Sequence, residues 1–213
     1  GPVDRLIDPV GARPGSARPR SRCVLAHGRM LTVVPMAGSP GDEVVEEVDR
    51  DGRVLRLVSR REMRTGRLRH RTVYIAVQHP DGRLLVHRRS PLKDVWPGWW
   101  DVAAGGVVAA GEAWEVAAVR ELAEELGIDV VRHGVALEPL DGGRLQTYDD
   151  ETVLVVGRCF RVVTPGPFTF ADGEVVEARW VDSSELSAML AGPDAVPFLP
   201  DGLAVLLPLL EIT

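Results

Sequence analysis

The segment Ala113–Leu126 constrains the fold more than any other part of the chain, because its pattern predicts an α-helix with defined ends. Gly111 precedes it, and Gly127 stands where a helix C-terminus favours a residue with positive φ. At about 100° per residue, aliphatic side chains gather on one side of this helix. They are Val116, Val119, Leu122, Ala123 and Leu126. We therefore expect the helix to pack on a core through this stripe.

The other side of the predicted helix carries Arg120, Glu121, Glu124 and Glu125. Glu121 and Glu125 are i,i+4 neighbours, and like charges at that spacing destabilise an isolated helix by about 0.2–0.5 kcal/mol. The acids also stand in the C-terminal half, where the helix dipole disfavours anions. A hard divalent cation would resolve both conflicts, because Mg²⁺ takes oxygen ligands and keeps waters that a phosphate can displace. A solvated acidic face is the alternative that the helix alone leaves open.

The residues before the helix extend this pattern. Gly106 is followed after five residues by Glu112, and Glu112 after seven residues by the run Arg120–Ile128. Together they match Gx5Ex7REUxEExGU, where U is aliphatic, at every defined position. This pattern is the Nudix box, and a motif of this length has high specificity. From about Glu43 to Ala191 the chain resembles the Nudix hydrolases.

The resemblance implies an α/β (α+β) fold, the Nudix α/β/α sandwich with a mixed β-sheet, in which a loop–helix–loop carries the box. It also implies an enzyme that uses Mg²⁺ or Mn²⁺ to direct water at a phosphorus atom of a diphosphate. By analogy, Glu121 and Glu125 are the principal metal ligands, and Glu124 is a further ligand or a water-orienting carboxylate. The carbonyl of Gly105 or Gly106 would complete the metal shell.

Two further residues of the box have an implied supporting role. Glu112 and Arg120 would pair and brace the loop against the helix, which holds the site in shape without taking part in the reaction. The implied substrate is a small molecule that contains a diphosphate, and a nucleoside diphosphate derivative is the expected class.

The loop before the box indicates a particular branch of the Nudix hydrolases. The stretch His87–Asp101, with Trp-Pro-Gly at its centre, and the approach Leu68–Arg71 are similar to the isopentenyl-diphosphate isomerase branch, which includes isomerase-like hydrolases. Isomerases need a cysteine and three metal-binding histidines. In this chain the cysteine position falls on Gly105, two of the histidine positions fall on Val107 and Met63, and only His70 matches. Hydrolysis is therefore preferred to isomerisation, which stays the alternative together with a non-catalytic ligand-sensing domain.

Substrate contacts are expected from the end of the predicted strand 84–89 and from the loop that follows it. One of Arg88 and Arg89 is expected to hold a phosphate bidentately, with a solvated strand end as the alternative. Trp99 and the neighbouring tryptophans would stack on a nucleobase, cover an apolar tail or fill the gap between loop and sheet. Glu174 and Glu177, or the segment Tyr148–Glu151, are candidates for a general base outside the box.

Outside the predicted helix, the pattern alternates strands with turns such as Asp51-Gly52 and Asp81-Gly82. The expected strands are 43–48, 54–59, 71–78, 84–89, 130–140, 152–163 and 174–181, with an added strand in 23–36. The expected further helices are 184–191, capped by Ser183, and 203–210, interrupted by Pro208. His70 and Cys159 are expected to be structural residues.

Charge divides the chain into two parts. Residues 1–42 form a basic arm rich in Pro, Gly and Arg, which is expected to be partly flexible, and residues 43–213 are the expected catalytic domain. A solvated tail is the preferred interpretation of the arm. An acidic partner or a transit peptide is the alternative.

Composition excludes several classes of protein. Of 213 residues, 45% are hydrophobic and 26% are charged, values typical of a folded domain. The net charge of −6 argues against binding to a nucleic-acid polymer or an anionic membrane surface, and two cysteines cannot build a disulfide scaffold. The simplest compartment is the cytoplasm. A homodimer through the 43–59 hairpin or the arm is compatible with the sequence.

Overall fold

The computed structural model describes residues 40–171 and 173–213. In this part of the chain, ten strands form one mixed sheet. The strands are β1 (Val44–Val48), β2 (Val54–Ser59), β3 (His70–Gln78), β4 (Leu84–Arg89), β5 (Trp100–Asp101), β6 (Ala104–Val107), β7 (Glu138–Pro139), β8 (Gln146–Asp149), β9 (Leu154–Val163) and β10 (Val175–Val181). The helices are α1 (Arg60–Thr65), α2 (Trp114–Leu126), α3 (Ser183–Ala191) and α4 (Pro200–Val205), with short 3₁₀ turns at 40–42, 141–143 and 207–209.

Strand β3 is the centre of this sheet because four strands, β1, β4, β6 and β9, pair with it. It runs parallel to β9, with His70 opposite Val155 and Gln78 opposite Val163, and antiparallel to β6. It is buried along almost its whole length, as expected for an apolar strand covered on both faces. β10 pairs with β4, and β1 and β2 form the hairpin that joins the other end of β3.

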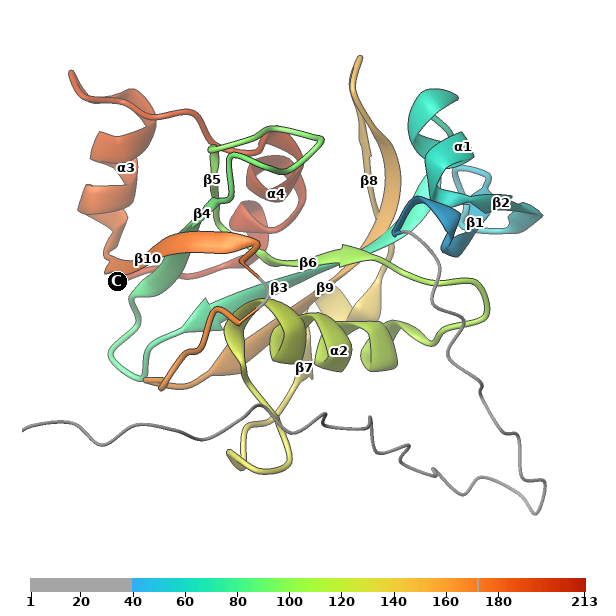
Figure 1. Ribbon diagram of the computed structural model, residues 1–213. Helices are drawn as coiled ribbons and strands as arrows, with labels where there is room; N and C mark the ends of the chain where they lie inside the picture. The colour runs from blue at the N-terminus through green and yellow to red at the C-terminus, as the bar shows by residue number, and fades with distance from the viewer. Residues whose placement is uncertain (1–39, 172) are drawn as a thin grey trace, which may run out of the picture. The chain divides into compact units, whose positions relative to one another are not determined.

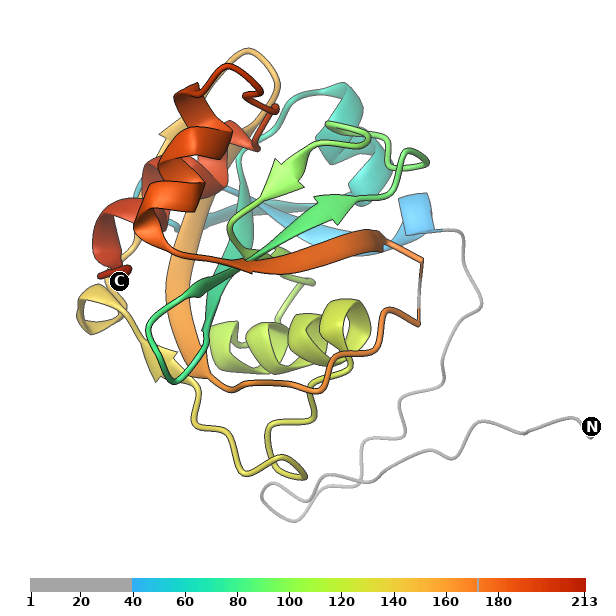
Figure 2. The same cartoon turned by 90° about the vertical axis from the view of Figure 1, so that its left-hand side faces the viewer.

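The alternation of side chains along β3 divides the core into two layers. Val73, Ile75 and Val77 pack with α2, whereas Tyr74 and Ala76 pack in the cluster that contains α3 and α4. Figures 1 and 2 show α2 on one face of the sheet and α3 with α4 on the other. The expected α/β/α sandwich with a mixed sheet is therefore confirmed. None of the helices within the described ranges has the length and apolar character that crossing a membrane requires.

The predicted end of α2 at Leu126 is confirmed and its start lies one residue later than predicted, but the predicted buried stripe is wrong. Val116 is 58% exposed and Ala123 is also exposed, and of the five predicted core residues only Leu122 and Leu126 are buried. The remaining buried positions are Ala117, Ala118, Glu121 and Glu125. The small alanines bring the helix close to the sheet, and two of the acids predicted on the side opposite the core, Glu121 and Glu125, are buried.

Several elements differ from the sequence-based expectations for local reasons. The expected strand 130–140 is reduced to β7, because residues 129–134 form a turn in which the Asp129 carboxylate accepts the amides of Val131 and Arg132. Helix α3 is capped by Asp182 in a capping box with Glu185, and not by Ser183.

The C-terminal helix also differs. α4 begins with Pro200 at its first turn and ends before the 3₁₀ turn 207–209, so the expected helix 203–210 is shorter and starts earlier. Helix α1 was not expected at all, and neither were the short strands β5 and β6. The predicted strand 23–36 and nearly all of the predicted arm lie outside the described residues.

The corrected orientation of α2 leads to a stability prediction. We expect Leu122→Ala to lower the free energy of unfolding by about 2–5 kcal/mol, because Leu122 is fully buried and its removal leaves a cavity. Val116→Ala on the same helix should change it by about 0.5 kcal/mol or less. Urea unfolding of the two variants measures both values. Equal costs would contradict the orientation of the helix.

Candidate functional site

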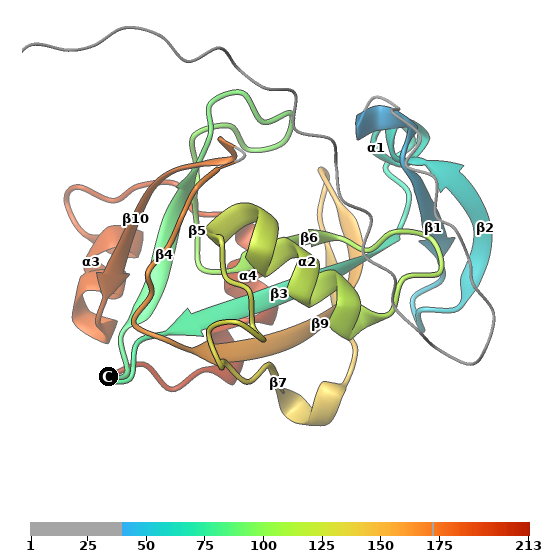
Figure 3. The same ribbon diagram turned by 60° about the horizontal axis from the view of Figure 1, so that its bottom comes forward.

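A cleft opens where β6 and α2 meet α1 and the loop that follows β4. Its lining includes Gly105 and Gly106 from β6, and Glu121 and Glu125 from α2. Cationic side chains from α1, the end of β4 and the following loop line the same cleft: Arg60, Arg64, Arg89 and Lys93. Figure 3 shows α1 beside the β1–β2 hairpin, on the other side of α2 from α3.

Two carboxylates of α2 are buried at this cleft. Glu125 is 3% exposed, and its Oε2 accepts the amide of Gly105 at 3.0 Å. Burial raises the pKa of Glu125 well above its usual value, and the neighbouring Glu121 raises it further. Burial also raises the pKa of Glu121, against the opposing effect of Arg120. Among the described residues Glu121 pairs with Arg120 at 2.7 Å, whereas Glu125 forms no ion pair.

Two glycines bring the backbone of β6 against these acids. Gly105 has a φ of 151°, and a Cβ there would lie 2.0 Å from the carbonyl oxygen of Val73 on β3. A Cβ on Gly106 would lie 2.6 Å from Oε1 of Glu121. The carbonyl of Gly106 accepts the hydroxyl of Thr72 at 2.9 Å and keeps a second lone pair. The close approach of strand and helix therefore depends on the missing side chains.

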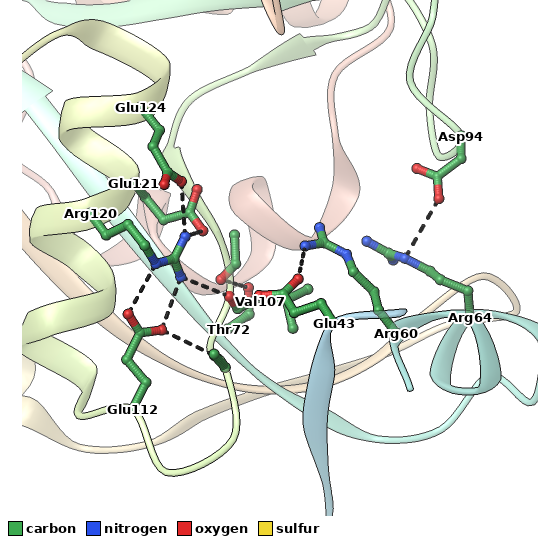
Figure 4. Close-up of polar contacts among 12 residues, drawn as sticks. Glu43, Arg60, Arg64, Thr72, Asp94, Val107, Glu112, Arg120, Glu121 and Glu124 are labelled. Carbon is green, nitrogen blue, oxygen red and sulfur yellow. Dashed lines mark hydrogen bonds and ion pairs between the residues drawn. The ribbon is translucent and has the colours of Figure 1, made fainter. Parts of the chain in front are cut away.

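Arg120 joins the remaining acids of the Nudix-like motif (Figure 4). Its guanidinium donates twice to Glu112, at 3.0 Å each, and once to the carbonyl of Val107 at 3.2 Å. Its Nη1 also donates to Glu121 at 2.7 Å and to Glu124 at 3.0 Å. The Glu112 carboxylate in turn accepts the amide of Ala109. One cation thus holds the loop, the strand and the helix together, in the arrangement expected of a bracing pair.

The donor chemistry of the cleft suits a hard divalent cation, although the protein supplies few ligands by itself. The side chain of Glu124 is 54% exposed, so of the three acids that α2 was expected to supply only Glu121 and Glu125 present buried carboxylates. Across residues 40–171 and 173–213, no group of three or more His, Cys, Asp or Glu side chains could hold a metal ion. Carboxylates, backbone carbonyls, waters and substrate oxygens together are a typical Mg²⁺ shell.

The structure separates the predicted substrate residues. Arg89 lines the cleft, whereas Arg88 points to Glu177, with 3.2 Å between the guanidinium and the carboxylate. Trp96 also lines the cleft, and Trp99 stands behind it with its ring centre 6.5 Å away.

The candidate general bases also divide into residues at the cleft and residues outside it. Glu174 lies at the cleft and pairs with Lys93, while Glu177 is held by Arg88 outside it. The segment Tyr148–Glu151 lies outside the cleft lining, and the Tyr148 hydroxyl donates to Asp150.

Sequence reasoning missed an acidic pair at the cleft. Asp101 and Asp201 are both buried, and the hydroxyl of Tyr74 donates to Asp201 at 2.9 Å. Burial raises the pKa of Asp101 to about 7, helped by the charge of Asp201. These residues come from β5, α4 and β3, which are far apart in sequence. No spacing pattern could have found them.

The geometry of the cleft agrees with the family and the proteins to which the chain is similar. The NUDIX domain family matches residues 68–202. A Salmonella typhi protein named uncharacterized Nudix hydrolase YfcD is 39% identical over 164 residues, which cover 77% of this chain and 83% of the relative. The uncharacterized Nudix hydrolase orf19 of Rhodococcus erythropolis is 37% identical over 175 residues, covering 79% and 92%. The crystal structure of DR0079 from Deinococcus radiodurans shares the fold, with a TM-score of 0.60, 24% identity and coverage of 73% and 93%.

The two glycines should respond differently to a methyl group. We expect Gly105→Ala to lower the free energy of unfolding by about 3 kcal/mol or more, because its Cβ meets the backbone of β3 and its φ is unfavourable. Gly106→Ala should cost about 1 kcal/mol, because it meets the movable end of the Glu121 side chain. Urea unfolding measures the costs, and a crystal structure of Gly106→Ala should show Glu121 displaced. A smaller loss of stability in Gly105→Ala than in Gly106→Ala would contradict this prediction.

His70 should make the fold sensitive to acid. Burial lowers its pKa from 6.5 to about 4, so the folded protein keeps it neutral while the unfolded chain protonates near 6.5. Its contribution to stability is complete above pH 6.5 and is lost as the pH falls towards 4, by about 3 kcal/mol. His70→Gln should remove this part of the loss between pH 7 and pH 4.

The exposed His133 provides the control for this measurement. A His133→Gln variant should show the same acid sensitivity as the unchanged protein. Urea unfolding at the two pH values gives the comparison. An equal loss of stability in the His70→Gln variant would show that His70 is not the group responsible.

Proposed function

Because the chain belongs to the Nudix family, we propose that it is a metal-dependent hydrolase that cleaves the phosphoanhydride bond of a diphosphate. The observation that carries this proposal is the pair of buried carboxylates, Glu121 and Glu125, facing the glycine backbone of β6 across from a basic wall. Glu125 is buried without an ion-pair partner among the described residues, and a buried acid of this kind is costly in a folded protein. Such a site is best explained by a positive ligand.

The proposed metal is Mg²⁺ or Mn²⁺, held by Glu121, Glu125 and a carbonyl of Gly105 or Gly106. When bound, the ion would neutralise phosphate charge and lower the pKa of a water. The exposed Glu124 fits a residue that orients water or completes the metal shell better than a principal ligand. Arg120 and Glu112 are positioning residues, since their contacts fix the loop and the helix and leave the cleft free.

The proposed substrate is a nucleoside diphosphate derivative. Arg89 at the cleft can hold a phosphate bidentately, and it replaces Arg88 as the favoured member of the expected pair. Trp96, which also lines the cleft, is better placed than Trp99 to stack on a base. Glu174 is the preferred proton acceptor outside the box, because it lines the cleft and Glu177 does not.

Within the family, we propose the isomerase-like hydrolase branch on the basis of the tryptophan loop. In this chain, the residues at the positions that isomerases use for catalysis favour hydrolysis. Gly105 stands where the isomerase cysteine is expected. Cys159 is buried in the layer of α3 and α4, and burial raises its pKa to about 12, which makes it unsuited to proton transfer at the cleft. A homodimer, a cytoplasmic location and a catalytic domain of residues 43–213 stay predictions.

Substitution of Glu125 tests the proposal most directly. We expect Glu125→Gln to reduce metal-dependent release of phosphate products by roughly 100-fold or more, because the amide cannot supply the negative charge to the ion. The matched control is Glu115→Gln on the same helix, where Glu115 is exposed and lies 3.4 Å from Arg158. The control should retain full activity, and both variants should keep the far-ultraviolet spectrum of the folded protein.

A panel of nucleoside diphosphate derivatives with Mg²⁺ or Mn²⁺ supplies the assay, and phosphate and mononucleotide products are measured. Normal turnover by Glu125→Gln at normal metal concentration would refute the assigned ligand. Proton exchange at carbon in an allylic diphosphate, without release of phosphate, would instead establish isomerisation. Stabilisation by nucleotide derivatives without any turnover would establish a sensing domain.

A further inference from the structure

We infer that α1 forms a second wall of the substrate cleft, and that Arg64, flanked by Arg60, binds the phosphate group that water does not attack. This inference rests on the proposed function for the identity of the substrate. The argument that this site binds an anion rests on the contacts of α1 itself. The ligand class is a diphosphate whose second phosphate carries charged oxygens.

Helix α1 contributes residues that the family match does not include. The match begins at residue 68, whereas α1 ends at Thr65. The hydroxyl of Ser59 caps α1 by accepting the amide of Glu62, which fixes the start of the helix. Arg60 and Arg64 are then i,i+4 neighbours on one face, and both line the cleft. In Figure 4 their side chains extend in the same direction from α1.

Arg64 is incompletely satisfied where it stands. Its side chain is 24% exposed, and its buried Nε has no hydrogen-bond partner within the described residues. Its nearest acid is Asp94, whose carboxylate is 72% exposed and lies 3.9 Å from that nitrogen. The Nε of Arg89, which lines the same cleft, is likewise buried without a hydrogen-bond partner within the described residues. Two arginines that line one cleft thus each keep a donor without a partner.

Like charges gather around Arg64 as well. Burial lowers the pKa of Arg64, and the charges of Arg60 and Arg89 lower it further, against the pull of Asp94. Arg60 has one close partner, Glu43, at 2.7 Å. A cluster of cations at a partly buried site is unfavourable in the free protein. An anion with several oxygens would satisfy the donors and the charge together.

The basic wall faces the acidic one. The charge of Arg60 reaches Glu121, whose pKa it lowers. One phosphate of a diphosphate can therefore lie against the carboxylate wall with its proposed metal, while the next phosphate lies against α1. This arrangement selects substrates with two adjacent phosphates over monophosphate esters, because a single phosphate cannot occupy both walls.

The test measures binding of inorganic pyrophosphate to the full chain by isothermal titration calorimetry, at low salt and with EDTA present. We expect Arg64→Gln to weaken the binding about tenfold or more, because charged hydrogen bonds are lost. The matched control is Arg61→Gln on the same helix, where Arg61 is 65% exposed and pairs with Asp42 at 3.3 Å. The control should change the dissociation constant by about twofold or less. Arg64→Lys keeps the charge and should bind more weakly than the unchanged protein.

Each outcome decides the inference. Selective weakening in Arg64→Gln supports it. Unchanged binding, equal weakening in Arg61→Gln, or no measurable binding of pyrophosphate by the unchanged protein would overturn it. If Arg64→Gln does not fold, Arg64→Lys makes the same decision, because pyrophosphate binding equal to that of the unchanged protein would show that the guanidinium of Arg64 does not bind the phosphate. Since EDTA removes divalent metal, the result does not depend on hydrolysis, which the Glu125→Gln assay tests separately.

Discussion

The site depends on two carboxylates that α2 turns towards the sheet instead of towards water. Burial of ionisable groups costs free energy, and it is tolerated only where donors or counter-charges compensate. Here the amide of Gly105 donates to Glu125, and Arg120 donates to Glu121. These contacts compensate in part, since burial still raises the pKa of both acids. The fold therefore holds two acids in place whose ionised forms are only partly compensated by the protein.

The same constraint explains the residues around the two acids. A helix can bring carboxylates this close to a strand only where the strand has no side chains in the way, which is the role of the two glycines. Ala117 and Ala118 allow the same approach from the helix side. Arg120 then ties Glu112 to the backbone of β6, so the loop before α2 cannot move independently of the strand.

Sequence patterns predicted the features that depend on neighbouring residues. The end of α2 at Gly127 follows from a left-handed residue, and the β1–β2 turn follows from Asp49 and Gly52. Features that depend on distant partners could not be predicted. Hydrophobicity alone places the acids of α2 in solvent, because a helical wheel contains no information about the glycines opposite. Arg88 and Arg89 differ only in the face of β4 on which they stand, and pairing of β4 with β10 decides which one reaches the cleft.

Charge separation within one cleft is what links the fold to the chemistry. α2 supplies acids on one side and α1 supplies arginines on the other, and neither set fully neutralises the other across the space between them. Arg60 pairs with Glu43 and Glu121 pairs with Arg120, so these two residues have their ion-pair partners outside the opposite wall. A ligand that is positive at one end and negative at the other satisfies both walls. A metal-bound diphosphate has this distribution of charge, and a neutral ligand of equal size does not.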